Sequence, residues 1–343
     1  MRALLLGSAV LLGSFSGTAS AATAWVSSNH IQVVDLDTAQ IVGRIPLQEF
    51  IHDMQFSPDG QTVYVASSQG FRVASASELR FTSKVADGGT MAVAVVADGS
   101  QVATLTKAPD AASLAARKAG APLPPSTVTI YSTLDMGVVA SWDVPGGSRD
   151  LAISAAGDTL FLLDPPAGYV RVYDAAGTEV DAIDVAPGER AANGHPQALY
   201  SGMEVSPDGK RVMIPVTSET ASSIIDVDLA GQRAERVIVQ DLGHRRRIQG
   251  LAWDEDGSGV YVTAVNHVVK FSDSGLPLAW QKLPVNYVDV APVPGAAETV
   301  MVAPTFSSKR RSGGVSVVDA QGNVLRSVEL PDMSPFHVAV SPE

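Results

Sequence analysis

The feature that most constrains this chain is a unit that recurs along most of its length. Its clearest copies are IHDMQFSPDGQTVYVASSQG from Ile51, LYSGMEVSPDGKRVMIPVTSE from Leu199 and IQGLAWDEDGSGVYVTAVNH from Ile248. Each copy reads as an alternating strand, a short polar turn and a second strand. Two further strands follow in each unit, as in VVDLDT and then IVGRIPL. Four short strands repeated about every 40–50 residues predict the blades of a β-propeller.

The turns of the repeat carry residues suited to tight reversal of the chain. Ser57–Gly60 and Ser206–Gly209 both read SPDG, in which proline fixes φ and glycine accepts a positive φ. A later strand of the unit often ends in aspartate, whose carboxylate we expect to accept hydrogen bonds from amides of the following turn. These aspartates are Asp35, Asp174, Asp226 and Asp319.

The two ends of the chain complete each other. Phe336–Pro342 reads as a first strand with nothing after it, whereas the segment from Thr23 supplies a second, third and fourth strand with no first. Joining them removes the open sheet edge at the seam. We therefore predict an all-β, seven-bladed propeller with four antiparallel strands per blade, closed by pairing the C-terminal inner strand with the N-terminal strands. The predicted inner strands end near Ser57, Val96, Ser154, Ser206, Asp254, Ala291 and Ser341.

The first 22 residues are predicted to be a secretory signal peptide. Arg2 precedes an apolar stretch over 3–15, and Ala19–Ala21 fits a small-residue cleavage pattern. An uncleaved membrane anchor is the alternative. We expect a periplasmic or secreted propeller domain over 23–343, with no membrane insertion after cleavage. Two segments, 107–125 and 187–197, interrupt the repeat and are predicted to protrude on one rim, the first with a helical turn.

Composition narrows the possible functions. The chain of 343 residues has a formal net charge of −12, so an acidic surface argues against nucleic-acid binding. It has no cysteine, which excludes disulfides, cysteine-ligated zinc, iron–sulfur clusters and covalent c-type haem. No cofactor is predicted.

The repeat resembles a known family. TVYVAS after SPDG, VVDLDT before IVGRIPL, and HVAVSP are similar to YVTN-type repeats, and the likeness to bacterial YncE-like propellers covers essentially 23–343. The resemblance implies an exported binding or surface protein, because family members are mostly of that kind. Some related propellers are non-catalytic subunits of periplasmic amine dehydrogenases, and others are lactonases.

Candidate functional residues follow from the architecture, because the first strand of each blade lines the central channel. Polar and ionisable side chains fall at the predicted entrance ends of these strands and indicate a small-ligand site at the channel mouth. A mouth that is simply polar and hydrated is the alternative. The predicted site comprises His52, Asp53, Arg149, Gln249, Asn286, Tyr287 and His337.

Two smaller hypotheses concern metal and anions. His52 and His337, from adjacent blades, could hold zinc or copper with Asp53, or could be hydrogen-bonded channel histidines or a general acid–base pair. Arg245, Arg246 and Arg247 form the densest positive run and could recognise an anionic ligand or an acidic partner, or could be a solvated loop.

No catalytic residues are assigned, because no motif of a known catalytic type occurs. The leading hypothesis is a non-catalytic interaction protein, a monomer or a subunit of a periplasmic complex. It would present its loop-bearing channel face to a protein partner or a small anionic ligand. The alternative is a periplasmic enzyme, such as a lactonase-like hydrolase, or the propeller subunit of a periplasmic dehydrogenase.

Overall fold

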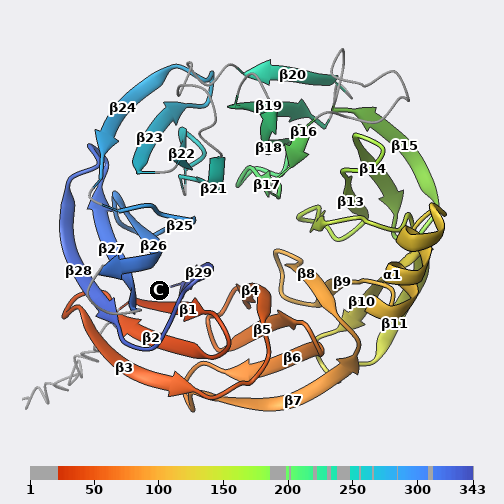
Figure 1. Ribbon diagram of the computed structural model, residues 1–343, viewed down its shortest axis with the longest axis horizontal. Helices are drawn as coiled ribbons and strands as arrows, with labels where there is room; N and C mark the ends of the chain where they lie inside the picture. Colours follow the sequence, from red (N-terminus) through yellow and green to blue (C-terminus); the bar gives the residue numbers. More distant parts are fainter. Residues whose placement is uncertain are drawn as a thin grey trace, which may run out of the picture.

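Seven sheets stand around a central axis like the blades of a propeller (Figure 1). The computed structural model describes residues 22–342 except 186–197, 201, 219–221, 230–232, 238–247, 255, 265, 284 and 308–311. The signal-peptide prediction and the insertion at 187–197 fall outside the described residues. The predicted fold class, an all-β seven-bladed propeller with four antiparallel strands per blade, is confirmed.

Blades are numbered here from the one that contains both chain ends, and their strands are given from the channel outward. Blade 1 contains β29 (His337–Val340), β1 (Thr23–Ser27), β2 (Ile31–Asp35) and β3 (Gln40–Ile45). Blade 2 contains β4 (Ile51–Phe56), β5 (Thr62–Ser67), β6 (Gly70–Ser75) and β7 (Arg80–Asp87). Blade 3 contains β8 (Thr90–Val95), β9 (Gln101–Thr106), β10 (Ser126–Ser132) and β11 (Val138–Val144). Blade 4 contains β12 (Asp150–Ile153), β13 (Thr159–Asp164), β14 (Tyr169–Asp174) and β15 (Glu179–Asp184).

The remaining blades follow the same plan, with one interrupted inner strand. In blade 5, β16 (Ala198–Tyr200) and β17 (Glu204–Val205) both pair with β18 (Arg211–Ser218), and β19 (Ser222–Asp228) and β20 (Arg233–Val237) follow. Blade 6 contains β21 (Ile248–Trp253), β22 (Gly259–Ala264), β23 (His267–Ser272) and β24 (Pro277–Lys282). Blade 7 contains β25 (Asp289–Pro292), β26 (Glu298–Ser307), β27 (Ser312–Asp319) and β28 (Val324–Leu330).

The chain ends close the ring as predicted. β29 pairs antiparallel with β1 in the register Ala24↔Val340 and Val26↔Val338. The Thr23 amide also donates to the Ser341 hydroxyl at 2.9 Å, and the Ser341 amide donates to the Thr23 carbonyl at 2.9 Å. Trp25 of β1 is 1% exposed and meets Phe56 of blade 2 edge-on, with ring centroids 5.6 Å apart. Pairing and packing therefore both hold the seam.

The turn chemistry is mostly as predicted. Gly60 and Gly209, the last residues of the two SPDG turns, have φ of 69° and 70°. Among the four strand-ending aspartates, Asp35, Asp174 and Asp319 accept hydrogen bonds from amides of the following turn. Asp226 differs because β19 continues past it, and its carboxylate instead pairs with Arg211.

The first insertion forms more ordered structure than a single turn. Asp110–Ala119 is an α-helix, α1, which lies between β9 and β10 on the outer side of the ring (Figure 1). Gly120 ends it with φ 63°, in the left-handed region that favours glycine. Within the described part of the chain, no helix is long and apolar enough to cross a membrane.

Candidate ligand site at the central channel

The inner strands surround a channel of about 690 Å³. Inner-strand residues at two positions before each turn recur in the channel wall, and we call these positions the upper and lower tiers. The upper tier lies four residues before the residue that begins each turn, and the lower tier lies two residues further along. In the channel wall, the upper tier consists of Asp53, Asp150, Gly202, Gly250, Asp289 and His337, and the lower tier of Gln55, Ala94, Ala152, Glu204, Ala252 and Ala291. The residues at the equivalent positions in blades 3 and 1, Ala92 and Ala339, are buried in the core.

The upper-tier aspartates join neighbouring blades. Asp53 accepts from the amides of Met54 (2.7 Å) in its own strand and of Val93 (2.9 Å) in the next blade. Asp150 repeats the arrangement with Leu151 (2.8 Å) and Met203 (2.9 Å). These carboxyls satisfy amides that strand pairing leaves free, so they have a structural role.

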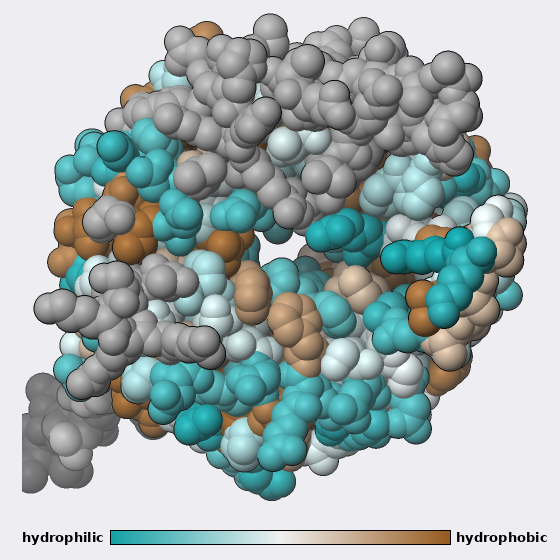
Figure 2. All heavy atoms as spheres, viewed as in Figure 1, coloured by the Kyte–Doolittle hydropathy of each residue, from teal (hydrophilic) through white to brown (hydrophobic). Residues whose placement is uncertain are grey.

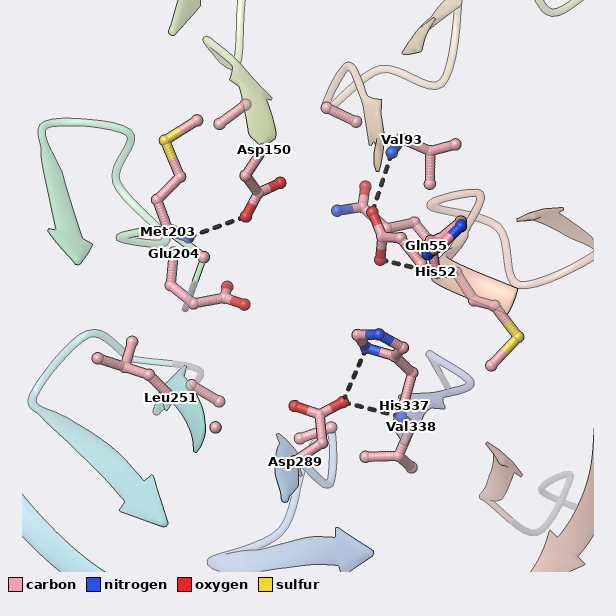
Figure 3. Close-up of a pocket in the computed structure, with 18 of the residues that line it drawn as sticks. His52, Gln55, Val93, Asp150, Met203, Glu204, Leu251, Asp289, His337 and Val338 are labelled. Carbon is pink, nitrogen blue, oxygen red and sulfur yellow. Dashed lines mark hydrogen bonds and ion pairs between the residues drawn. The ribbon is translucent and has the colours of Figure 1, made fainter. Parts of the chain in front are cut away.

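Asp289 makes the same link at the last blade boundary. Its carboxylate accepts from the Val338 amide at 2.9 Å and lies 3.5 Å from Nδ1 of His337 (Figure 3). Burial lowers the pKa of His337, but its hydrogen bond to Asp289 and the nearby carboxylates raise it, and the net shift is upward. His337 is therefore part of the blade-joining set.

Enclosure by protein also shifts the pKa of the channel acids. Burial, followed by the charge of Asp53, raises the pKa of Asp150 to about 7. The pKa of Asp53 is raised as well, chiefly by burial. Amide hydrogen bonds oppose these shifts without cancelling them.

Glu204 in the lower tier was not predicted from the sequence. Its carboxyl points into the channel (Figure 3) and has no hydrogen bond or ion pair among the described residues. The side chain contacts channel solvent, yet the surrounding ring of protein desolvates it, and this burial, then Asp150, raises its pKa well above the ordinary value. At the same tier in blade 2, the Gln55 side chain accepts from the Val95 amide at 3.1 Å. Glu204 is thus a channel carboxyl without a structural partner. The sequence signal that could have identified it is the inner-strand register, because most other positions of this tier are alanine.

His52 lies at the channel mouth and has no polar partner among the described residues. Its Nε2 atom is buried and makes no hydrogen bond to any of them. Burial, then the charges of Lys107 and His337, lowers the pKa of His52 to about 4, so the ring is neutral at pH 7. Phe50 contacts it edge-on with centroids 5.1 Å apart, and Phe336 lies against Phe50 at 5.4 Å.

Arg149 and Gln249 also line the channel, as predicted. The Arg149 guanidinium is exposed, directly precedes β12, and forms no ion pair with any described residue. The Gln249 side-chain oxygen is buried without a hydrogen-bond partner among the described residues. The exposed Arg149 guanidinium is therefore the group available to a ligand.

The prediction of Asn286 and Tyr287 as channel residues was wrong. It took Ala291 as the start of the turn in blade 7, but the Val293 amide closes this turn on Glu298 at 3.0 Å, two residues later. The channel positions are consequently Val288 and Asp289. Tyr287 is fully buried in the core and its hydroxyl lies 2.7 Å from that of Ser316, whereas Asn286 is exposed and does not line the channel.

The hypotheses of a metal site and of an anion-binding arginine run have different outcomes. Among the residues with described positions, no group of three or more His, Asp or Glu side chains is arranged to hold a metal ion. Asp53 is already bonded to amides and His337 faces Asp289, so the arrangement does not favour a His52–His337–Asp53 metal site. Arg245, Arg246 and Arg247 lie outside the described residues.

Comparison with known proteins supports the fold class. No protein-family model matches the chain, and no curated protein sequence matches it. Among solved structures it is similar to a protein of unknown function from Desulfotomaculum acetoxidans, with TM-score 0.66, 18% identity and coverage of 94% of this chain and 99% of that one. It is also similar to Kuenenia stuttgartiensis hydrazine synthase, with TM-score 0.65, 16% identity and coverage of 86% and 90%. At these identities the likeness shows a shared propeller fold.

Proposed function

We propose that this chain is an exported, non-catalytic binding protein of the YVTN/YncE-like kind that holds a small anionic ligand at its channel mouth. The observation that carries the proposal is Arg149, an exposed guanidinium beside the channel that forms no ion pair with any described residue. In an acidic chain, an unpaired arginine beside a cavity is a specific place for a carboxylate or phosphate, because its planar fork donates two parallel hydrogen bonds.

The arrangement of the acids supports binding over catalysis. Asp53, Asp150 and Asp289 each accept hydrogen bonds from strand amides, which is a structural use of the carboxyl. A side-chain nucleophile activated by a base lies within hydrogen-bond reach of that base. Among the described side chains, His52 makes no hydrogen bond to any acid or hydroxyl. These features favour a binding protein over the lactonase-like alternative, which stays a prediction.

Thermal unfolding with added small anions tests the proposal. A ligand that binds only the folded state raises the midpoint, by roughly 1–2 °C per kcal/mol for a chain of this size. We expect stabilisation by millimolar succinate or phosphate, and its loss in Arg149→Ala. Arg80→Ala is the matched control, because Arg80 lies on the outer strand β7 and pairs with Glu78. Equal stabilisation of both variants would refute the proposed role of Arg149.

A protein partner at the same face is the second candidate. It is favoured by Phe50 and Phe336, which lie against each other at the mouth although each is about two-fifths exposed (41% and 39%). Aromatic side chains of this kind are enriched at protein interfaces. A Phe50→Ala, Phe336→Ala double variant should lose a co-purifying partner that Arg149→Ala keeps. Retention of that partner by the double variant would count against this candidate.

A further inference from the structure

A second cavity of about 490 Å³ lies beside the channel mouth. It shares His52, Met91 and Arg149 with the channel, and its other walls are the first insertion and two neighbouring turns of blades 3 and 4. We call it the insertion pocket. Its volume falls within the range of roughly 300–1,000 Å³ typical of small-molecule sites. Figure 2 shows the central opening and, near it, hydrophilic side chains over the region of α1.

Close backbone packing holds the insertion in place. A Cβ atom at Gly146 would lie 2.2 Å from the Pro124 carbonyl oxygen and 2.4 Å from that of Leu123. A Cβ atom at Gly147, which has φ 92°, would lie 2.9 Å from Pro166 Cγ and 3.1 Å from Leu123 Cδ1. The Lys107 amide donates to the Gly89 carbonyl at 2.9 Å at the other end of the insertion. The pocket is thus built into the packing of the insertion against the blades.

The charges of the insertion pocket are mainly positive. Lys107, Arg117 and Arg149 line it together with a single carboxylate, Asp110. That carboxylate pairs with Lys107 at 2.8 Å. Arg117 and Arg149 form no ion pair with any residue whose position is described. Two free guanidinium groups therefore approach one cavity from different segments, in a chain whose net charge is −12.

The rest of the lining is suited to a short carbon skeleton. Apolar side chains of Met91, Leu123, Pro124, Pro165 and Pro166 form much of the wall, whereas the imidazole of His52 is neutral at pH 7. Prolines and a packed leucine offer little hydrogen bonding, so the polar contacts come from the two arginines and from the other polar residues of the lining, which include three serines.

We propose that the insertion pocket binds a small dianion, with Arg117 and Arg149 paired to its anionic groups. Short dicarboxylates and phosphate compounds share this chemistry. The inference rests on the proposed function, since it gives the anion at the channel mouth a class and a location. It adds Arg117, α1 and the insertion to the binding surface.

Isothermal titration with succinate, inorganic phosphate and acetate tests the proposal on the purified protein. We expect succinate or phosphate to bind and acetate, a monoanion, to bind at least about tenfold more weakly, because one charge-assisted contact is lost. Binding of succinate alone indicates two separated anionic groups, and binding of phosphate indicates one dianionic group. If acetate binds as strongly as succinate and phosphate do, the assignment of a dianion is overturned.

A pair of neighbouring variants locates the site. Arg117→Ala should weaken binding about tenfold or more, whereas Lys118→Ala should leave it unchanged. Both residues are basic side chains in the last turn of α1, so an effect on helix stability or net charge is the same in each, but Lys118 does not line the pocket. Arg117→Lys keeps the charge without the planar fork and should fall between them.

The outcomes separate this inference from the proposed function. Weakening by Arg149→Ala with no effect of Arg117→Ala keeps an anion at the channel mouth and overturns the insertion pocket. Glu204→Gln should not alter affinity, because Glu204 lines only the channel. A large effect of Glu204→Gln without one of Arg117→Ala places the ligand on the channel axis and likewise overturns the pocket. No binding of any probe overturns both proposals.

Discussion

The central channel and the insertion pocket share a wall at Arg149 but are built from opposite charges. The channel carries acids that belong to the inner strands, and most of these acids bond to amides of the adjacent blade. The pocket carries bases, and two of its three cationic side chains come from a segment inserted between β9 and β10. The comparison indicates that most acids near the axis assemble the ring, whereas Arg117 on the insertion and Arg149 beside it form no ion pair with any described residue.

The largest expected effect concerns the structural side of this comparison. Asp150→Ala removes a carboxyl that accepts from the Leu151 and Met203 amides. Leaving two enclosed donors without a partner costs about 3 kcal/mol of unfolding free energy. Chemical denaturation at about pH 4, where the raised pKa values of both acids affect stability least, should show this loss, and Glu204→Ala should change stability by less than about 1 kcal/mol because its carboxyl has no partner to lose. Equal effects of the two substitutions would contradict the division into structural and free acids.

The second prediction concerns the pH dependence of stability. The pKa of Asp150 is raised from 3.8 to about 7, so between about pH 4 and pH 7 the folded chain binds a proton that the unfolded chain has released. The stabilisation that this extra proton gives the folded chain is complete below about pH 4 and is lost as the pH rises through about 7. The raised pKa values of Asp53, Glu204 and His337 act in the same direction, whereas the lowered pKa of His52 acts in the opposite direction.

We therefore expect unfolding free energy to fall by about 2 kcal/mol from pH 4.5 to pH 7.5, since one pKa unit corresponds to about 1.4 kcal/mol and channel water reduces the shift. Urea denaturation across this range measures it. Asp150→Asn imitates the neutral acid and should make the unfolding free energy depend less on pH. A wild-type curve that rises across this range, or an Asp150→Asn curve as steep as the wild type, would show that Asp150 does not titrate in this way.

The sequence predicted the architecture well because repeat, turn and closure signals are local. The Asp-Gly turns and the unpaired inner strand at Phe336–Pro342 were sufficient for the blade number and the seam. The site was predicted less well, because channel residues depend on strand register, and one misplaced turn moved the assignment from Asp289 to Tyr287. Glu204 was missed for the related reason that the lower tier was not considered.

The insertion pocket could not have been predicted from residue patterns. Its walls come from segments far apart in the chain, and they meet because the backbone at Gly146 allows the Leu123–Pro124 carbonyls to approach it. Neither the charge pattern of 107–125 nor its alanine content shows that Arg117 and Arg149 line one cavity. Such a site depends on tertiary packing, which a repeat analysis does not describe.

The smallest expected change in stability, with a distinct change in affinity, concerns Asp110, the carboxylate of the insertion pocket. Its ion pair with Lys107 is largely exposed on the Asp110 side (84%), so Asp110→Asn should leave stability almost unchanged. The same substitution removes a negative charge from the cavity and releases Lys107, so succinate or phosphate should bind a few times more tightly. Titration at low and at 0.5 M salt measures this gain, which screening should reduce.

Asp135→Asn, on a turn of blade 3 that does not line the pocket, changes net charge equally and should have no such effect. A gain that is the same in both variants would mean that overall charge, and not the pocket, sets the affinity.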